Sequence, residues 1–481
     1  MKCRWISRLC RIFQRKRQPT PTSAAIPAKV KIMGDKLPPG TKVAFKSGRA
    51  CLILDWLAEG TQGHVYRAVL DGDRVCLKIW KGNGATTPQQ RSHLVRYAAQ
   101  GRPTTTFVKV LDVVPSQDGG APVGYAMELV DLSQVEGIEG LLAYTPLPPM
   151  SHLVDLAILL VLSLRRLHAR GLAYRDLSLA NVRFDFKRRV WVVFLDPDNI
   201  TPDGAEYPIG IRGTLGCLAP EIITKGAPPS QLTDLYGVAV LLFQLLMGGM
   251  HPLYGRNHLR FQVDGEKTRL FMEAHRPVFV FDPACDANRP DEVAHGRLIY
   301  CWTGLPHFMQ QLFTRAFTAG IVHPEQRIRE STWLTALLTL RGLIDACPQC
   351  GEERFVEPNG SKAGSKSALC RQCQTEFAVG ARLVASTGSE IVLRPGVTIR
   401  SSQLKADTLH RGTDCTIATV AAVGMGKRRL ALRNTSNAPW TLQKKDRRSR
   451  PLLPSRAVVL DPETEIHFDA TPTVGVVKPS L

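Results

Sequence analysis

The sequence lacks the features of a secreted or membrane-spanning protein. Its first residues hold no apolar segment followed by a cleavage site of small residues, so we expect no secretory signal. The longest uncharged run begins at Leu235 and holds only a short apolar stretch before Gly248 and Gly249. A membrane span needs about 20 apolar residues. We therefore expect this run to form a buried helix in a cytoplasmic protein.

The cysteines lack a pairing scheme. Of the twelve cysteines, four form a metal-ligand pattern and the others are scattered along the chain. Disulfides persist mainly in oxidising compartments, where small scaffolds are dense in cysteine. The cysteine usage of this chain therefore favours a reducing compartment.

Acidic residues are scarce at both ends of the chain. Residues 1–49 hold 13 lysines and arginines against Asp35 alone, and residues 380–481 hold 16 against 8 acids. The segment between them is neutral, with 33 residues of each sign, although the whole chain carries a formal charge of +20. We infer that the basic ends serve anchoring or partner binding. The hydrophobic content of 44% is typical of a globular protein.

Residues 1–17 predict a basic amphipathic helix. Apolar residues recur there at helical spacing among basic ones, namely Trp5, Ile6, Leu9, Ile12 and Phe13. Such a helix would lie on an anionic membrane surface and make the protein peripheral at the inner membrane. A frayed basic tail is the alternative. Pro19 to Pro39 is rich in proline and predicts a linker.

Two short motifs in the middle of the chain place carboxylates as phosphoryl transfer would need them. Tyr174 to Asn181 reads Tyr-Arg-Asp-Leu-Ser-Leu-Ala-Asn, so Asp176 precedes Asn181 by five positions. One loop can then aim a carboxylate at an incoming hydroxyl and an amide oxygen at a metal-bound phosphate chain. An apolar strand that begins at Val192 ends in Asp196, a carboxylate suited to Mg²⁺ held between phosphates.

Strand patterns precede these motifs, at residues 51–54, 59–66 and 74–80. A turn that carries Gly60 and Gly63 allows backbone N–H groups to approach phosphates closely, although an ordinary hairpin is the alternative. Lys78 inside an apolar strand is more specific evidence, because a buried ammonium is costly unless an anion meets it.

Together these motifs resemble a protein kinase over about residues 45–345. The matching features, in chain order, are the glycine turn, Lys78, the loop with Asp176, Asp196, Ala219-Pro220-Glu221 and Asp234. A helix over Leu153–Leu167, apolar on nearly all sides, precedes the loop, and a last helix runs through Leu340.

The resemblance implies a role for each matched residue. Lys78 would hold the α- and β-phosphates of ATP, and Asp176 would accept the proton of the substrate hydroxyl. Asn181 and Asp196 would bind Mg²⁺, and Glu221 would form a structural pair with Arg327. The remaining positions implied to contact the nucleotide are Gly60, Gly63 and Val65 in the turn, and Met127, Glu128 and Val130 in the hinge.

Several positions depart from the kinase pattern. Ala58 replaces the first glycine, and Tyr174 replaces the usual histidine of the catalytic loop. Ser178 stands where serine/threonine kinases place a phosphate-contacting lysine, and Asp196 is followed by Pro-Asp instead of Phe-Gly. These losses weaken charge stabilisation and positioning, which supply most of the catalysis in phosphoryl transfer.

The usual partner of the strand lysine is also missing. No glutamate occurs between Gly60 and Met127, so the helix expected at about residues 88–100 offers Lys78 only glutamines. These are Gln89, Gln90 and Gln100. A neutral partner gives about half the strength of a charged one. We therefore expect Lys78 to be loosely held until nucleotide binds.

Residues 194–199 and 247–252 are similar to an atypical bacterial kinase group. They read Phe-Leu-Asp-Pro-Asp-Asn and Met-Gly-Gly-Met-His-Pro. Members of that group often carry C-terminal modules and are linked to tellurite-resistance or stress genes. The resemblance therefore implies a bacterial stress-associated kinase.

A metal-ligand pattern follows the kinase-like segment. Cys347-Pro-Gln-Cys350 and Cys370-Arg-Gln-Cys373 are two C-x-x-C knuckles separated by 19 residues. Four thiolates in a tetrahedron are the ligands of Zn²⁺ in closed structural sites. A redox pair is the alternative. With four protein ligands no open position remains, so we expect a structural zinc.

Short runs of alternating apolar and polar residues after Ala381 predict a small β-sandwich. Leu460 to Ile466 resembles the end of a forkhead-associated domain, which implies a phosphothreonine peptide as partner. A structural or protein-binding sandwich is the alternative. The charge run Lys444, Lys445, Arg447, Arg448 and Arg450 predicts a solvated loop, and we do not expect nucleic-acid binding.

The sequence thus predicts an α+β protein with a bilobal kinase-like fold, a zinc ribbon and a β-sandwich-like end. The expected division is a basic segment and linker at 1–44, a kinase-like domain at 45–345, a ribbon at 346–379 and a β-rich domain at 380–481. The expected function is a protein serine/threonine kinase that uses ATP and Mg²⁺ on a protein substrate. A pseudokinase scaffold and a small-molecule phosphotransferase stay open.

Overall fold

The computed structural model describes residues 36–60, 62–82, 86–205, 214–260, 265–355, 367–378, 381–386, 390–404, 415–424, 429–443, 449–468 and 474–478. The basic segment at 1–17 and the charge run at 444–448 lie outside these residues, so what we expect of them stays a prediction. Arg450, the last residue of that run, is exposed. Among the helices that the structure describes, none has the length and apolar character that a membrane crossing requires.

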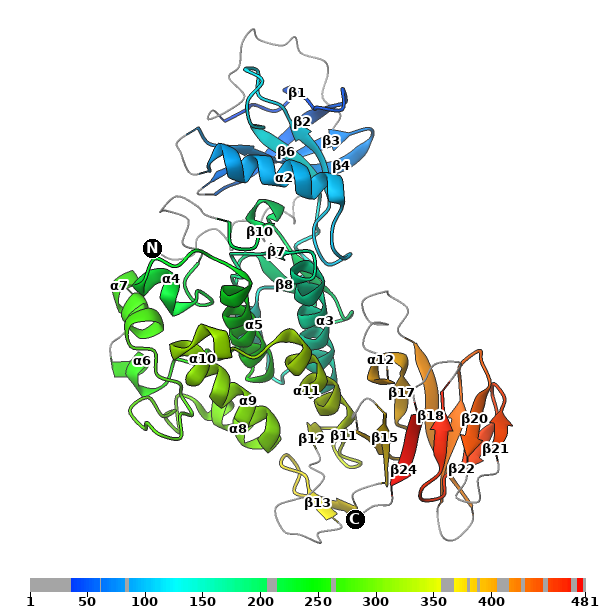
Figure 1. Cartoon of the computed structure of the whole chain (residues 1–481). Helices are drawn as coiled ribbons and strands as arrows, with labels where there is room; N and C mark the ends of the chain where they lie inside the picture. The colour runs from blue at the N-terminus through cyan, green and yellow to red at the C-terminus, as the bar shows by residue number, and fades with distance from the viewer. Residues whose placement is uncertain are drawn as a thin grey trace.

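The smaller lobe, residues 36–128, is a six-stranded antiparallel sheet with one helix beside it (Figure 1). The strand order is β1-β2-β3-β4-β6-β5. The bounds are β1 Lys42–Ala44, β2 Ala50–Glu59, β3 Gly63–Leu70, β4 Asp73–Trp80, α2 Pro88–Gln100, β5 Val110–Val114 and β6 Gly124–Glu128. Helix α2 begins with a capping box between Thr87 and Gln90, with Pro88 at its first position. The helix expected at about 88–100 is confirmed.

The larger lobe is mainly helical. Its helices are η1 Ile138–Ala143, α3 Met150–His168, α4 Pro220–Thr224, α5 Gln231–Leu246, α6 Arg256–Arg260, α7 Glu266–Leu270, η3 Phe271–His275, α8 Gly296–Gly304, α9 His307–Phe317, α10 Ala319–Val322, η4 Pro324–Gln326 and α11 Glu330–Gly342. Its short strands and turn are β7 Leu172–Ala173, β8 Val182–Phe184, β9 Val192–Phe194, η2 Pro197–Asn199 and β10 Thr201–Pro202. Helices α3 and α5 are buried on nearly all sides, as their apolar sequences predict, and share the main core with α11.

Two short hairpins follow the helical lobe. The first pairs β11 Ile344–Ala346 with β12 Glu353–Phe355, and the second pairs β13 Ser367–Leu369 with β14 Glu376–Ala378. Each hairpin carries one C-x-x-C knuckle. The two knuckles lie together, because the Sγ atoms of their four cysteines are all within 4.8 Å of one another.

Residues 381–478 form two antiparallel sheets around a second hydrophobic core, which includes Trp440, Ile466 and Phe468. One sheet has the order β16-β15-β24-β23-β20-β21 and the other β17-β18-β19-β22. The bounds are β15 Ala381–Ala385, β16 Glu390–Leu393, β17 Thr398–Arg400, α12 Ser401–Leu404, β18 Thr416–Val423, β19 Arg429–Asn434, β20 Trp440–Gln443, β21 Ser449–Leu452, β22 Ala457–Val459, β23 Glu465–His467 and β24 Val474–Lys478.

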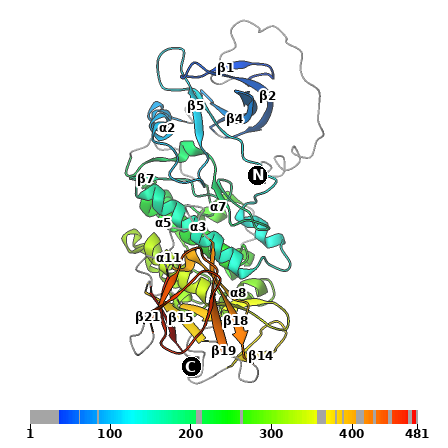
Figure 2. The same cartoon turned by 90° about the vertical axis from the view of Figure 1, so that its right-hand side faces the viewer.

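The β-rich end packs against the end of α11, away from the smaller lobe (Figures 1 and 2). A Cβ added to Gly342 would lie 1.5 Å from the carbonyl oxygen of Glu390, so this close approach requires glycine. An ion pair of 2.8 Å joins Asp345 on β11 to Arg394 beyond β16. The hairpins, the two sheets and the helical lobe are therefore in direct contact.

Candidate active site and metal centre

The glycine turn between β2 and β3 lies beside the end of β4, the strand that carries Lys78. The N–H of Gly60 donates to the carbonyl of Gly63 at 2.9 Å, and Val65 on β3 pairs with Lys78 on β4. A Cβ on Gly63 would lie 2.5 Å from the carbonyl oxygen of Ile79. Glycine is therefore required at position 63 by close packing of the backbone.

Lys78 is buried and held by two carboxylates. Its Nζ lies 2.9 Å from Oδ2 of Asp198 and 3.5 Å from Oδ1 of Asp196, and the residue is only 4% exposed. Burial alone would lower the pKa of Lys78, but the negative charges of Asp196 and Asp198 outweigh burial and raise the pKa above its ordinary value. The ammonium is thus protonated and paired.

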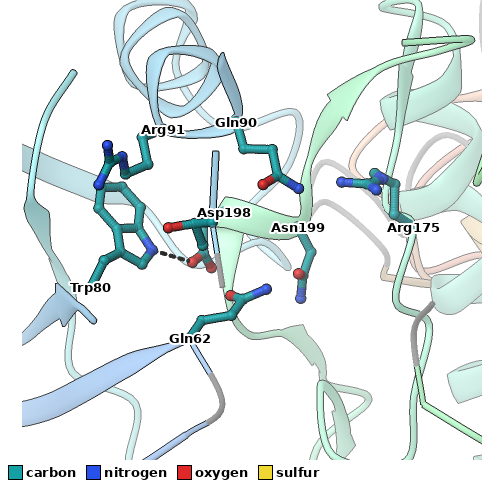
Figure 3. A pocket seen from close by; sticks show the side chains of 8 residues that line it. Gln62, Trp80, Gln90, Arg91, Arg175, Asp198 and Asn199 are labelled. Atoms are coloured by element: carbon teal, nitrogen blue, oxygen red, sulfur yellow. Dashed lines mark hydrogen bonds between the residues drawn. The ribbon is translucent and has the colours of Figure 1, made fainter. Parts of the chain in front are cut away.

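The lysine partner is not the one that sequence reasoning suggested. Gln90 on α2 uses its Oε1 to accept the N–H of Thr87 at 2.8 Å, as part of the capping box. Asp198 instead accepts hydrogen bonds from Lys78 and from the hydroxyl of Tyr125. It also accepts one from Nε1 of Trp80, which Figure 3 shows. The expectation that Lys78 is loosely held before nucleotide binds is therefore wrong.

The catalytic-loop motif brings Asp176 and Asn181 together as its spacing predicts. Nδ2 of Asn181 donates to Oδ2 of Asp176 at 2.8 Å, and the N–H of Thr214 donates to Oδ1 at 2.9 Å. Burial raises the pKa of Asp176, and the hydrogen bonds from Thr214 oppose that rise. Because Asn181 uses its nitrogen here, its Oδ1 is the atom suited to a metal ion.

A buried carboxylate of the helical lobe holds the backbone of this loop. Asp234, at the start of α5, accepts the N–H groups of Tyr174 at 2.6 Å and of Arg175 at 3.1 Å. His168 at the end of α3 bridges Asp234 and Glu330. Arg175 takes a φ of +66°, a strained conformation for a non-glycine residue that these bonds support.

Two departures from the kinase pattern have structural explanations. Tyr174 is fully buried beside Phe107 and Phe194, and its hydroxyl donates to the carbonyl of Leu195, just before Asp196. Ser178 is also fully buried, and its Oγ accepts the N–H of Asn181 at 3.3 Å. Ser178 therefore closes a turn and does not supply the positive charge of the usual lysine.

The hinge residues lie where the sheet continues into the helical lobe. Met127 and Glu128 end β6, and Val130 follows two residues later. The Glu128 carboxylate pairs with Arg102 at 2.6 Å. The backbone N–H of Glu128 donates to the carbonyl of Lys109 at 3.0 Å. The side chain of Glu128 is thus committed to protein contacts.

Glu221 and Arg327 form the ion pair that the sequence suggests. Nη1 and Nη2 of Arg327 each donate to the Glu221 carboxylate at 2.7 Å, and the pair is nearly excluded from solvent. A bidentate, buried pair of this kind is rigid. It ties helix α4 to the segment after α10.

The four cysteines of the knuckles converge on one point. Their Sγ atoms all lie within 4.8 Å of one another. Cys347 and Cys373 are 3.5 Å apart, and Cys350 and Cys370 are 3.7 Å apart. A tetrahedral zinc with bonds of about 2.3 Å would separate its sulfur ligands by about 3.8 Å. The cysteines therefore fit a Zn²⁺ ion.

Each hairpin of this centre also contacts the helical lobe. Glu353 on β12 accepts the N–H and Oγ–H of Ser151, at 2.7 and 2.8 Å, and caps the start of α3. Arg371, inside the second knuckle, donates to the carbonyl of Tyr300 and to Oγ1 of Thr303 near the end of α8. Charges at these helix ends suit the helix dipoles.

No protein-family model matches the chain. Mouse ribosomal protein S6 kinase alpha-4 is 35% identical over 91 residues, which are 18% of this chain and 12% of the mouse protein. Human ribosomal protein S6 kinase-related protein is 32% identical over 100 residues, 21% and 24% of the two chains. The serine/threonine-protein kinase ppk21 of Schizosaccharomyces pombe is 28% identical over 102 residues, 20% and 18%.

The chain thus spans less than a quarter of the length of these curated relatives. Among solved structures, the autoinhibited serine kinase domain of the giant muscle protein titin is 14% identical, with a TM-score of 0.42 over 59% of this chain and 79% of that chain. The similarity to the curated kinases supports a place in the protein kinase-like superfamily.

The bridge at His168 predicts a pH-dependent stability. Burial would lower the pKa of His168, but hydrogen bonds to Asp234 and Glu330 raise it to about 9, against about 6.5 in the unfolded chain. The stabilisation is thus complete below about pH 6.5 and is lost as the pH rises through about 9. We expect His168→Gln to lower the free energy of unfolding by about 2–3 kcal/mol at pH 6 and by much less at pH 9.5.

Denaturant titrations at the two pH values check this expectation. His275→Gln, at an exposed histidine, is the matched control. A cost for His168→Gln that is the same at pH 6 and pH 9.5 would contradict the account.

Proposed function

We propose that the chain is a protein serine/threonine kinase that transfers the γ-phosphate of ATP to a hydroxyl. The observation that carries the proposal is the combination of a paired, buried Lys78 beside Asp196 with the bonded pair of Asp176 and Asn181. A scaffold that only recruits partners needs none of these groups. The curated relatives with similar segments include proteins named serine/threonine-protein kinases, which also supports the proposal.

Asp176 would accept the proton of the attacking hydroxyl. The hydroxyl oxygen forms a bond to the γ-phosphorus, the bond from that phosphorus to the β–γ bridging oxygen breaks, and ADP leaves. The hydrogen bonds from Asn181 and Thr214 fix the direction of the Asp176 carboxylate. A positioned base of this kind contributes about 10²–10⁴-fold in rate.

Oδ1 of Asn181 and the carboxylate of Asp196 would hold Mg²⁺, which neutralises the charge that builds up on the phosphates. Both offer oxygen atoms, the ligand type that Mg²⁺ prefers. Lys78 would hold the α- and β-phosphates beneath the turn with Gly60 and Gly63. Val65, Met127, Glu128 and Val130 would contact the nucleoside part.

The burial of Ser178 favours two alternative functions, a pseudokinase scaffold and a small-molecule phosphotransferase. Its burial leaves the catalytic loop without the usual phosphate-contacting charge, which would suit a pseudokinase scaffold. The same loss would suit a phosphotransferase that acts on a small molecule. The atypical bacterial type rests on the sequences at residues 194–199 and 247–252 and remains part of this proposal.

The central prediction is that Asp176→Asn abolishes transfer. We expect radiolabelled phosphate to pass from ATP with Mg²⁺ to a protein acceptor or to the chain itself, and the variant to lose at least about a hundredfold in rate. Asparagine keeps the size of the residue and can still accept from Thr214, so ATP binding should change little.

Asp118→Asn, at an exposed turn in the smaller lobe, is the matched control and should transfer phosphate like the wild type. Binding of ATP without transfer to any protein would support the scaffold. Transfer to a small molecule alone would support the small-molecule phosphotransferase.

We also propose that Cys347, Cys350, Cys370 and Cys373 hold one structural Zn²⁺. The mutual approach of the four Sγ atoms supports this. Because Glu353 and Arg371 cap helices α3 and α8, the metal would also stabilise the contact of the hairpins with the helical lobe. Zinc binding supplies on the order of 10 kcal/mol of folding free energy in zinc-finger peptides.

For this centre we expect one zinc per chain by elemental analysis, lost in Cys373→Ser and kept in Cys415→Ser, a cysteine outside the group. Chelation should increase hydrogen exchange in the hairpins, and in the first turn of α3 where Glu353 caps Ser151. ATP binding should stay near normal. Reduced protein that contains no metal would remove the proposal.

The partner of residues 381–478 is proposed to be a protein, with a phosphothreonine peptide as the more specific candidate. The support is the two-sheet arrangement and the sequence at 460–466. Binding of residues 1–17 to an anionic membrane surface rests on sequence alone.

A further inference from the structure

We propose that Asp198 is the positioning residue for Lys78, and that it replaces the helix carboxylate on which kinases ordinarily depend. Lys78, Asp196 and Asp198 would then be assembled before nucleotide arrives. The inference rests on the proposed function and concerns the organisation of the same site.

Asp198 is held from several directions. Its Oδ1 accepts from Lys78 at 3.1 Å and from the Tyr125 hydroxyl at 2.9 Å, and its Oδ2 accepts from Nε1 of Trp80 at 2.9 Å. The side chain is only 4% exposed. A buried carboxylate is costly unless it is paired and hydrogen-bonded, and this one meets a cation and two neutral donors. Its position is therefore strongly determined.

The three donors form a rigid frame in the sheet. Lys78 and Trp80 are two residues apart on β4, so their side chains leave the same face. Tyr125 on β6 pairs directly with Lys78, and its ring packs against Trp80 with the centroids 5.4 Å apart. The frame is part of the sheet.

Asp198 belongs to the other lobe, on the turn that follows Asp196. Pro197 fixes φ at the first position of this turn, and the N–H of Asn199 donates to the carbonyl of Asp196 at 3.0 Å. Asp196 itself takes a left-handed φ of +49°. Holding Asp198 therefore also holds Asp196, so one contact between the lobes sets both the lysine and the metal-binding carboxylate.

Helix α2 lies close by and packs against the turn Pro197–Asn199, which carries Asp198. Gln90 and Arg91 from α2 line a small cavity together with Trp80, Asp198 and Arg175 (Figure 3). The Gln90 carboxamide remains in the capping box. The partner of Lys78 therefore comes from the turn after Asp196 and not from Gln90 of α2.

The test uses Asp198→Asn in the full chain, with two readouts. The first is the rate at which N-hydroxysuccinimidyl acetate acylates Lys78 in nucleotide-free protein, measured by mass spectrometry, with Lys109 on the surface as internal standard. The second is kcat and KM for ATP with Mg²⁺. An amide in place of the carboxylate loses the charge and turns a donor toward Trp80 or Tyr125. We expect Lys78 acylation to rise at least tenfold and kcat to fall about 30-fold.

Matched variants separate positioning from local packing. Gln90→Ala on α2 and the exposed Asp118→Asn should change Lys78 acylation less than threefold. If Asp198→Asn does not fold, Trp80→Phe combined with Tyr125→Phe takes its place. This pair removes two donors and keeps the carboxylate, and Lys78 acylation should rise about threefold.

The acylation readout stands even if the proposed function fails. A wild type that transfers no phosphate would reject the kinase proposal, whereas the acylation of Lys78 would still report on Asp198. Acylation of Lys78 in folded Asp198→Asn that matches the wild type would overturn the inference. A rise in Lys78 acylation in Gln90→Ala as large as the rise in Asp198→Asn would also overturn the inference.

Discussion

The buried ammonium of Lys78 is the constraint on which the arrangement of the site depends. A lysine that is 4% exposed is tolerated only where negative charge meets it, and here that charge comes from a turn of the opposite lobe. The contact with Asp198 joins β4 and β6 to the turn that begins at Asp196. The ion pair of Lys78 and Asp198 thereby connects the sheet of the smaller lobe to the turn of the larger lobe that carries Asp196.

Residues of the helical lobe position the rest of the site. Asp234 holds the backbone of the loop before Asp176, and Tyr174 spans from that loop to the carbonyl of Leu195 beside Asp196. The tyrosine thus joins the catalytic loop to the same turn that Asp198 joins to the sheet. Tyr174 and Asp198 both stand where the kinase pattern has other residues, and each of them supplies a link in this structure.

Local signals explain why much of the fold was predictable. Thr87, Pro88 and Gln90 mark the start of α2, and the continuous apolar runs of α3 and α5 leave no polar face for solvent. The five-residue interval between Asp176 and Asn181, and the repeated C-x-x-C pattern, also depend on short stretches of chain. These features need no knowledge of distant contacts.

The features that sequence reasoning missed depend on residues far apart in the chain. Asp198 lies 120 positions after Lys78, and its neutral donors Trp80 and Tyr125 are apolar residues that a pattern assigns to the core. The cap that Glu353 supplies to α3 spans 202 positions. An acid two positions after Asp196, in a chain whose helix α2 carries no glutamate, was a signal that pointed to a substitute partner.

The most direct test of this account is the state of Lys78 before any nucleotide is bound. In protein labelled with ¹⁵N-lysine, the Nζ resonance of Lys78 is assigned by its loss in Lys78→Met. The account predicts an ammonium signal with hydrogens that exchange slowly with water, unlike those of surface lysines. An Nζ that exchanges as fast as the surface lysines in nucleotide-free protein would show that Asp198 does not hold it, and would contradict the account.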